Sequence, residues 1–139
     1  GLNAAVRATL QKPTGPLSSQ DLLSLTELNA CCRNVSSVEG LEAARNLATL
    51  YLQSNRLANL TVPSKLTNLT TVDLRFNPLT NGLFPDGLTK LTRVLLKSSQ
   101  LTNLTLPDGL SVLIELDLGS NRFTSFNVPS NMVGVGVLD

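Results

Sequence analysis

Apolar residues recur along this chain with a constant period, at every twenty-second position. Four segments align without a gap, and they read NLATLYLQSNRLANLTVP, NLTTVDLRFNPLTNGLFP, KLTRVLLKSSQLTNLTLP and VLIELDLGSNRFTSFNVP. Extending the period by one copy in each direction defines the repeat starts, which are Leu25, Leu47, Leu69, Leu91, Leu113 and Val135. A constant period of this length indicates stacked structural repeats. The chain therefore divides into a non-repeating segment, residues 1–24, and repeats over residues 25–139, of which the last is incomplete.

Within each copy, the apolar positions predict one strand followed by a turn. The fourth and sixth positions alternate with polar residues, as in a strand with one buried face. These inward positions are Leu50, Leu52, Val72, Leu74, Val94, Leu96, Leu116 and Leu118. The eleventh and sixteenth positions should close the core from the other side, and they are Leu57, Leu79, Leu101, Phe123, Val62, Phe84, Leu106 and Val128. A proline follows the sixteenth position in each copy, which favours a short helical turn or an extended segment there.

The ninth position carries a polar column inside this apolar frame. It holds Asn55, Asn77 and Asn121, whose carboxamides can pair with backbone groups left free where the chain turns out of a strand. Ser99 interrupts the column and should bond less completely. The full pattern, L-x-x-L-x-L-x-x-N-x-L, predicts an α/β solenoid of the leucine-rich-repeat class. We expect a right-handed curved array with a parallel β-sheet on its concave face and short helical or extended turns on its convex face.

The non-repeating segment, residues 1–24, predicts a helical cap over the apolar end of the array. Leu2, Val6 and Leu10 form one helical stripe, which stops before Pro13. Ser18 and Asp21 then have the spacing of a capping box, so a second short helix should lead into the first strand.

The stretch LSSQDLLSLTELNACCRNVSSVEGLEAARNL, with its short helix and degenerate first repeat, resembles the N-terminal cap of internalin-type bacterial leucine-rich-repeat proteins. The repeat period is similar too, whereas the TLPDGL turns depart from the internalin pattern. The resemblance implies a secreted or surface-attached bacterial protein that binds other macromolecules. It carries over no ligand contacts to individual residues.

Composition limits the partners. The net charge is +1 and charged residues make up 15% of the chain, so nothing favours nucleic acid as a partner. No apolar run reaches the length of a membrane span, which argues against membrane insertion. The expected partner is another protein, with a surface glycan as the alternative.

The third, fifth and seventh positions of each copy should project from the concave face, because they flank the inward residues. The candidate ligand-binding residues on this face, together with one at the eighth position, are Tyr51, Asp73, Arg75, Phe76, Arg93, Leu95, Lys97, Glu115 and Asp117. An aromatic side chain beside arginines has the composition of an interface hot spot, here Tyr51 with Arg75 and Arg93.

Two alternatives weigh against a binding role for these residues. Asp73 and Asp117 could simply pair with Arg75, Arg93 and Lys97 across the strands and keep the sheet soluble. Phe76 stands where other copies have serine, so it is either exposed for binding or packed over the turn, and packing is the favoured interpretation.

Other apparent signals carry less weight. The sequons at Asn34, Asn59, Asn68 and Asn103 each have a core residue in the middle, so the repeat itself generates them. The only cysteines, Cys31 and Cys32, are adjacent and are interpreted as two buried or half-buried thiols, with a vicinal disulfide or a redox role as the alternative.

No catalytic, cofactor-binding or metal site is expected. The chain has no histidine, which excludes histidine-based triads and zinc motifs. Asp73 and Asp117 are two strands apart, and no cleft is expected around this carboxylate pair.

The C-terminal sequence VGVGVLD begins a sixth strand and has no capping motif after it. We therefore expect either a longer protein or an end covered by a partner. The alternative functions are a structural spacer that self-associates through this end, and a targeting unit for a catalytic domain elsewhere.

Overall fold

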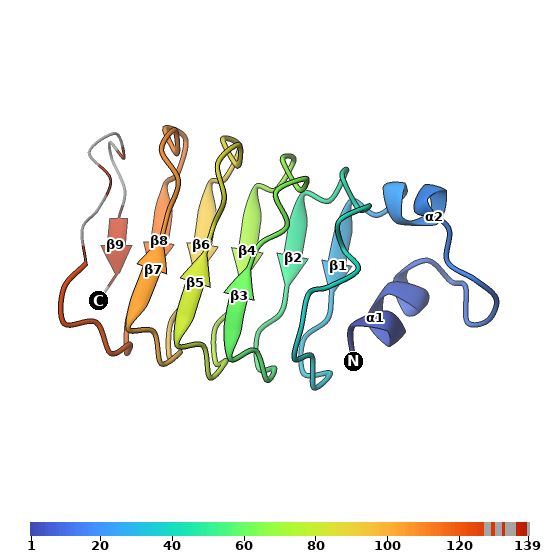
Figure 1. Ribbon diagram of the computed structural model, residues 1–139, viewed down its shortest axis with the longest axis horizontal. Coiled ribbons are helices and arrows are strands. Elements are labelled where there is room, and N and C mark those ends of the chain that lie inside the picture. Colours follow the sequence, from blue (N-terminus) through green and yellow to red (C-terminus); the bar gives the residue numbers. More distant parts are fainter. Residues whose placement is uncertain (127–128, 130–131, 133–135, 139) are drawn as a thin grey trace.

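The computed structural model describes residues 1–126, 129, 132 and 136–138. Figure 1 shows the turns of the chain stacked side by side in sequence order, with two helices at the N-terminal end of the stack. Two parallel sheets run along the stack, one six-stranded and one three-stranded. The predicted leucine-rich-repeat solenoid with an N-terminal cap is confirmed.

The six-stranded sheet contains the strand that the sequence predicts in each repeat. Its strands follow one another in chain order, and each pair is parallel. They are β1 (Glu27–Asn29), β2 (Thr49–Tyr51), β4 (Thr71–Asp73), β6 (Arg93–Leu95), β8 (Glu115–Asp117) and β9 (Gly136–Leu138). From β1 to β8 the register is one repeat per strand, so that Leu28, Leu50, Val72, Val94 and Leu116 lie side by side.

The last strand departs from the predicted period. Leu116 of β8 pairs with Val137 of β9, whereas the period of the earlier repeats would place Leu138 opposite Leu116. The final copy is therefore one residue shorter than the sequence period predicts. The start expected at Val135 lies outside the described residues.

The other face of the stack carries a second parallel sheet. It consists of β3 (Asn59–Thr61), β5 (Asn81–Leu83) and β7 (Asn103–Thr105), again in register from one repeat to the next. The chain is thus extended and paired just before each of these prolines. After each proline in these copies the chain makes a tight turn, as where the Leu66 N–H donates to the Pro63 carbonyl over 3.1 Å.

The predicted core columns lie between the two sheets. Leu52, Leu57, Val72, Leu74 and Phe84 are each no more than 1% exposed. Packing of this kind stabilises the stack because each turn covers the apolar face of the next. Near the C-terminal end the core is less complete, since Leu106 and Phe123 are only half-buried. Val128 lies outside the described residues.

The asparagine column joins consecutive turns. The Asn77 carboxamide donates to the Leu52 and Leu74 carbonyls, both over 2.9 Å, and its Oδ1 accepts from the Leu57 N–H over 3.1 Å. Asn55 and Asn121 make the equivalent bonds in their own turns. Each carboxamide therefore satisfies three buried backbone groups that belong to two repeats.

Ser99 breaks this column as expected. Its Oγ is buried and has no hydrogen-bond partner among the described residues. The Leu79 N–H, which corresponds to the Leu57 N–H one repeat earlier, likewise has no acceptor among the bonds of the described chain. A serine side chain is too short to bridge two turns, so the joint between these repeats lacks its side-chain link.

Two helices form the cap. Helix α1 (Leu2–Thr9) buries Ala5 and Val6 against the first repeat, and its half-buried Leu2 and the adjoining Leu10 pack against the same core. Helix α2 (Ser19–Leu23) begins with the predicted capping box, in which the Ser18 hydroxyl accepts from the Asp21 N–H and the Asp21 carboxylate accepts from the Ser18 N–H. No helix among the described residues is long and apolar enough to cross a bilayer.

Asp21 makes the cap sensitive to acid. Its carboxylate accepts from Lys12 Nζ over 2.8 Å and from the Ser18 N–H over 2.7 Å, and these bonds, with Lys12 the largest cause, hold the pKa of Asp21 well below its usual range. A carboxylate whose pKa is lowered by folding stabilises the folded state above its unfolded pKa, about 3.9, and this stabilisation is lost as the pH falls further.

We therefore expect Asp21→Asn to lower the melting temperature at pH 7 and to flatten its decline below about pH 4. Thermal unfolding followed by circular dichroism between pH 7 and pH 2 measures both effects. Asp86→Asn is the control, since Asp86 is exposed and lies outside the cap. If the melting temperature of the Asp21 variant fell below about pH 4 as steeply as that of the wild type, another carboxylate would control unfolding in acid.

Candidate functional site

The eighth position of each repeat has a left-handed backbone conformation. The φ angles are +56° at Ser54, +58° at Phe76, +55° at Ser98 and +57° at Ser120. For a bulky residue such as phenylalanine this region is unfavourable, and such strain tends to persist where function maintains it. The Phe76 side chain is 54% exposed. The expectation that Phe76 packs over the turn is therefore wrong, because its backbone directs the ring to the surface.

Arg75 is held in place by the residue two positions before it. Its Nε and Nη2 donate to the two oxygens of Asp73 over 3.0 and 2.7 Å, and Asp73 Oδ1 also accepts from the Arg75 N–H over 3.1 Å. The Asp73 side chain is 3% exposed and that of Arg75 is 38% exposed. The pKa of Arg75 is raised, first by its hydrogen bond with Asp73. A buried carboxylate thus fixes a guanidinium that remains open to solvent.

Arg93 on β6 is held by a residue of the adjacent strand, β8. It lies opposite Glu115 in the register of β6 and β8, and the two side chains form an ion pair at the surface. The pKa of Arg93 is raised, first by this hydrogen bond, and smaller electrostatic effects come from Tyr51 and Arg75. Lys97 is exposed and makes no ion pair within the described chain.

The alternative in which the aspartates pair with cations across the strands is correct for the pair of Asp73 with Arg75 but wrong about its geometry, because this pair forms within one repeat. Asp73 pairs along its own strand with Arg75, and the cross-strand pair uses Glu115. The Asp117 Oδ1 accepts from the backbone N–H of Gly119 over 3.1 Å, as Asn29 does from Cys31. Acidic or amide side chains at the fifth position thus shape the end of the strand.

Burial separates the nine candidate residues into two groups. Asp73, Leu95 and Asp117, all at the fifth position, are 2%, 6% and 8% exposed, so they support the face without presenting much surface to a partner. Tyr51 and Glu115 are half-buried, as is Arg75. The more accessible residues are Tyr51, Arg75, Phe76, Arg93, Lys97 and Glu115, which we call the arginine patch.

The cysteines are free. Cys31 is half-buried, but Cys32 is exposed, which corrects the expectation of two buried or half-buried thiols. The pKa of Cys31 is raised by its hydrogen bond with Cys32 and by burial.

The middle residues of the four glycosylation motifs are mostly in the core. Val35, Leu60 and Leu69 are buried as expected, while Leu104 is half-buried. The described residues contain no group of side chains suited to holding a metal ion.

The outer surface of the three-stranded sheet was not predicted from the sequence. Asn59, Asn81 and Asn103 stack there in the open, with Asn81 Nδ2 donating to Asn59 Oδ1 over 3.0 Å and Asn103 Nδ2 donating to Asn81 Oδ1 over 3.1 Å. The signal was present in the aligned triplets NLT, NGL and NLT, whose middle residues point inward. Two of these triplets match glycosylation motifs, and none was predicted to be a strand.

Comparison with known proteins supports the repeat architecture. A family model described as Leucine Rich Repeat matches residues 68–91. Among solved structures, the chain is similar to the functional domain of InlJ from Listeria monocytogenes, which includes a cysteine ladder. Sequence identity is 29% and the TM-score is 0.82, over 96% of this chain and 29% of that one. The chain thus spans less than a third of the InlJ structure. Among curated proteins no sequence matches it.

Two other internalins of Listeria monocytogenes show weaker likeness. For InlF the identity is 20% and the TM-score 0.44, over 89% of this chain and 50% of that one. For InlC2 the identity is 18% and the TM-score 0.44, over 99% of this chain and 91% of that one.

This chain has only two cysteines, which are adjacent in the first repeat, so it contains no cysteine ladder of its own. The repeat pattern and the likeness to InlJ support a role as a protein-interaction module. The chain is thus a leucine-rich-repeat solenoid whose stacked turns resemble those of the internalin InlJ.

Proposed function

We propose that this chain is the recognition module of a secreted or cell-surface bacterial protein, and that it binds a partner protein through the arginine patch on the outer face of the six-stranded sheet. The likeness to InlJ supports the location and the general role. The proposal for the patch rests on the side chains themselves.

The observation that carries the proposal is Phe76. An aromatic ring that is 54% exposed, on a backbone with φ +58°, lowers solubility and strains the turn at once. Serine at the same place in the neighbouring copies shows that the fold itself does not need an aromatic side chain there. A phenylalanine that is present despite its cost in solubility and in backbone strain is what we expect of a residue that contacts an apolar pocket of a partner.

The two arginines of the patch favour the same role, and one of them, Arg75, precedes Phe76 in the chain. Each is held by a carboxylate, Arg75 by Asp73 and Arg93 by Glu115, so less side-chain entropy is lost when a partner binds. Arginine and aromatic residues dominate the energetics of protein interfaces. Lys97, without an ion pair in the described chain, adds a charge that can steer an acidic partner toward the patch.

The test is a double variant, Arg75→Glu with Arg93→Glu. Immobilised wild-type protein is first used to capture partners from extracellular material, and binding of the captured partner is then measured by interferometry. We expect the double variant to bind about 30- to 1,000-fold more weakly, since two interface arginines are each worth about 1–2 kcal/mol.

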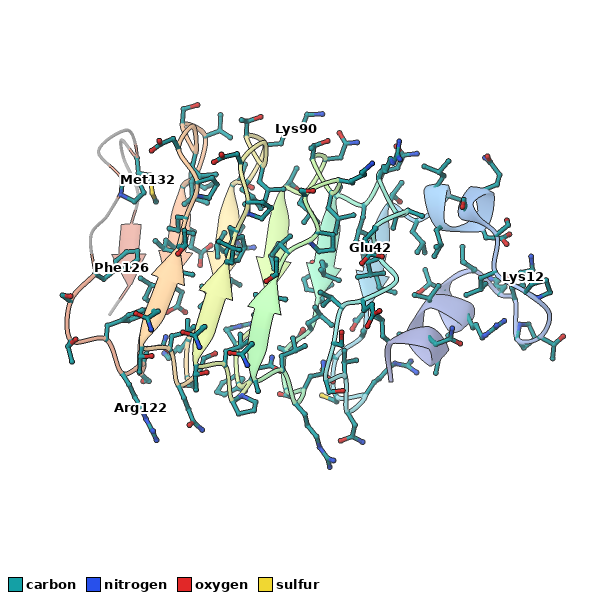
Figure 2. All side chains as sticks on the ribbon, in the orientation of Figure 1. Lys12, Glu42, Lys90, Arg122, Phe126 and Met132 are labelled. Atoms are coloured by element: carbon teal, nitrogen blue, oxygen red, sulfur yellow. The ribbon has the colours of Figure 1, made fainter. Side chains whose placement is uncertain are left out.

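The matched control is Arg56→Glu with Arg122→Glu, which makes the same change of charge at two turn residues outside the patch. Figure 2 shows Arg122 pointing away from the array at its edge. The control should bind normally. Because Arg75→Glu leaves the buried Asp73 carboxylate without its partner, binding is measured at a temperature at which circular dichroism shows both variants to be folded. Equal binding by the patch variant and wild type would contradict the proposed surface.

A further inference from the structure

The three-stranded sheet has an open edge at β3. The Val62 N–H donates to the Leu83 carbonyl over 3.0 Å, and the Ala58 carbonyl accepts from the Thr80 N–H over 2.8 Å, so the backbone groups of even-numbered residues face β5. Because these directions alternate along a strand, the N–H and C=O groups of Asn59 and Thr61 face the first repeat. No backbone partner meets them anywhere in residues 1–126.

The first repeat should have supplied the missing strand. One period before β3 the chain passes through residues 37–39, which form no ladder with β3, and it turns at Glu39 and Gly40, where the φ of Gly40 is +95°. A groove of about 470 Å³ lies between the two segments. Its walls include Ser37 on one side and Asn59 and Thr61 on the other, with Val62 and the buried Val38 among its lining.

We propose that this groove binds an extended, basic peptide segment of a partner protein as an additional strand beside β3. The groove is separate from the arginine patch, so the inference goes beyond the function proposed above. Strand addition uses main-chain hydrogen bonds for affinity and flanking side-chain contacts for specificity. Asn59 and Thr61 offer two donors and two acceptors at the spacing that an incoming strand matches.

The negative charge of the groove indicates that the bound segment is basic. The only charged residues that line the groove are Glu39 and Glu42, and both are exposed. One oxygen of Glu42 accepts from the Gly40 N–H over 2.9 Å, which holds this carboxylate at the groove wall. Neither glutamate forms an ion pair with a residue of the described chain. A lysine or arginine on the bound strand would supply the missing counter-charge.

The probe is a synthetic peptide, acetyl-Lys-Val-Thr-Val-Lys-amide, titrated into ¹⁵N-labelled protein while amide spectra are recorded. We expect saturable shifts at Asn59 and Thr61 and slower hydrogen exchange at these two amides, because their N–H groups gain acceptors. The charge-reversed peptide, acetyl-Glu-Val-Thr-Val-Glu-amide, should bind at least about tenfold more weakly. Two further versions carry N-methyl groups at the odd or the even residues, and one of them must lose binding because its donors toward β3 are blocked.

A protein variant separates charge from shape. Glu39→Gln with Glu42→Gln keeps the size of both side chains and an acceptor for Gly40, and it should weaken binding of the lysine peptide by about tenfold or more at low salt. Glu27→Gln with Asp86→Asn removes the same charge at exposed positions outside the groove and should leave binding unchanged.

Three results would overturn the inference. The first is the absence of shifts at Asn59 and Thr61 at millimolar peptide. The second is equal binding of all peptide versions, which would show that neither backbone pairing nor charge matters. The third is a set of shifts confined to Tyr51, Arg75 and Arg93, which would place the peptide on the arginine patch and leave the proposed function of that patch standing.

Discussion

Replacing Asn77 with alanine is expected to lower the free energy of unfolding by about 2–4 kcal/mol, because a buried backbone group left without a partner costs about 1–3 kcal/mol and partial relaxation reduces the sum. The change removes the partner of the Leu57 N–H and of the Leu52 and Leu74 carbonyls, all inside the core. Urea unfolding followed by circular dichroism measures the effect. A loss under about 0.5 kcal/mol would contradict the role assigned to the asparagine column.

The reciprocal variant is Ser99→Asn, which restores the column where this chain interrupts it. The Ser99 hydroxyl is buried without a partner in the described chain, and an asparagine there would meet the Leu79 N–H. We expect a gain of about 1 kcal/mol, the usual net value of satisfying such groups. Lower stability would show that the turns around residue 99 have adapted to the smaller side chain.

Leu74→Ala is expected to destabilise the protein by about 2–5 kcal/mol. Leu74 is fully buried between the two sheets at the centre of the stack, and it has turns on both sides that keep the resulting cavity from collapsing. Because repeats are stabilised mainly by their neighbours, the lost contact weakens two interfaces at once. Equilibrium unfolding in urea gives the change directly.

Val112→Ala provides the matched control for Leu74. Val112 is 46% exposed and lies in a turn, so its truncation should change the free energy of unfolding by less than about 0.5 kcal/mol. If both variants were equally stable, the assignment of Leu74 to the core would be wrong.

The repeat strands and most of the core could be predicted from the sequence because one physical rule generates them. Alternation around Leu50 and Leu52 sets a strand, and the fixed period aligns that strand with Val72 and Leu74 in the next turn. The asparagine column was predictable for the same reason, since Asn55 and Asn77 occupy equivalent turns. Among the described strands of the six-stranded sheet, the period gave the wrong register for β9, whose pairing with β8 is shifted by one residue.

The candidate site was harder to predict because it depends on conformations that residue types do not specify. Serine tolerates many backbone conformations, so a column of serines did not reveal the left-handed turn that exposes Phe76. Asp73 and Asp117 were expected at the surface because carboxylates are usually exposed, yet both are buried. Asp73 accepts from the guanidinium and the N–H of Arg75, and Asp117 accepts from the Gly119 N–H. The three-stranded sheet was missed because Asn59 and Thr61 also fit another motif.

The stacked repeats are proposed to present Phe76 and the arginine patch to a protein partner. Photo-cross-linking tests this proposal most directly, with benzoylphenylalanine placed at position 76 in one protein and in place of Leu83 in another. Leu83 is 41% exposed on β5 of the three-stranded sheet, so it is a comparably open apolar site elsewhere on the stack. Efficient cross-links to the partner from position 76 and few from position 83 are expected. Cross-links of equal yield from both positions, or from position 83 alone, would contradict the claim.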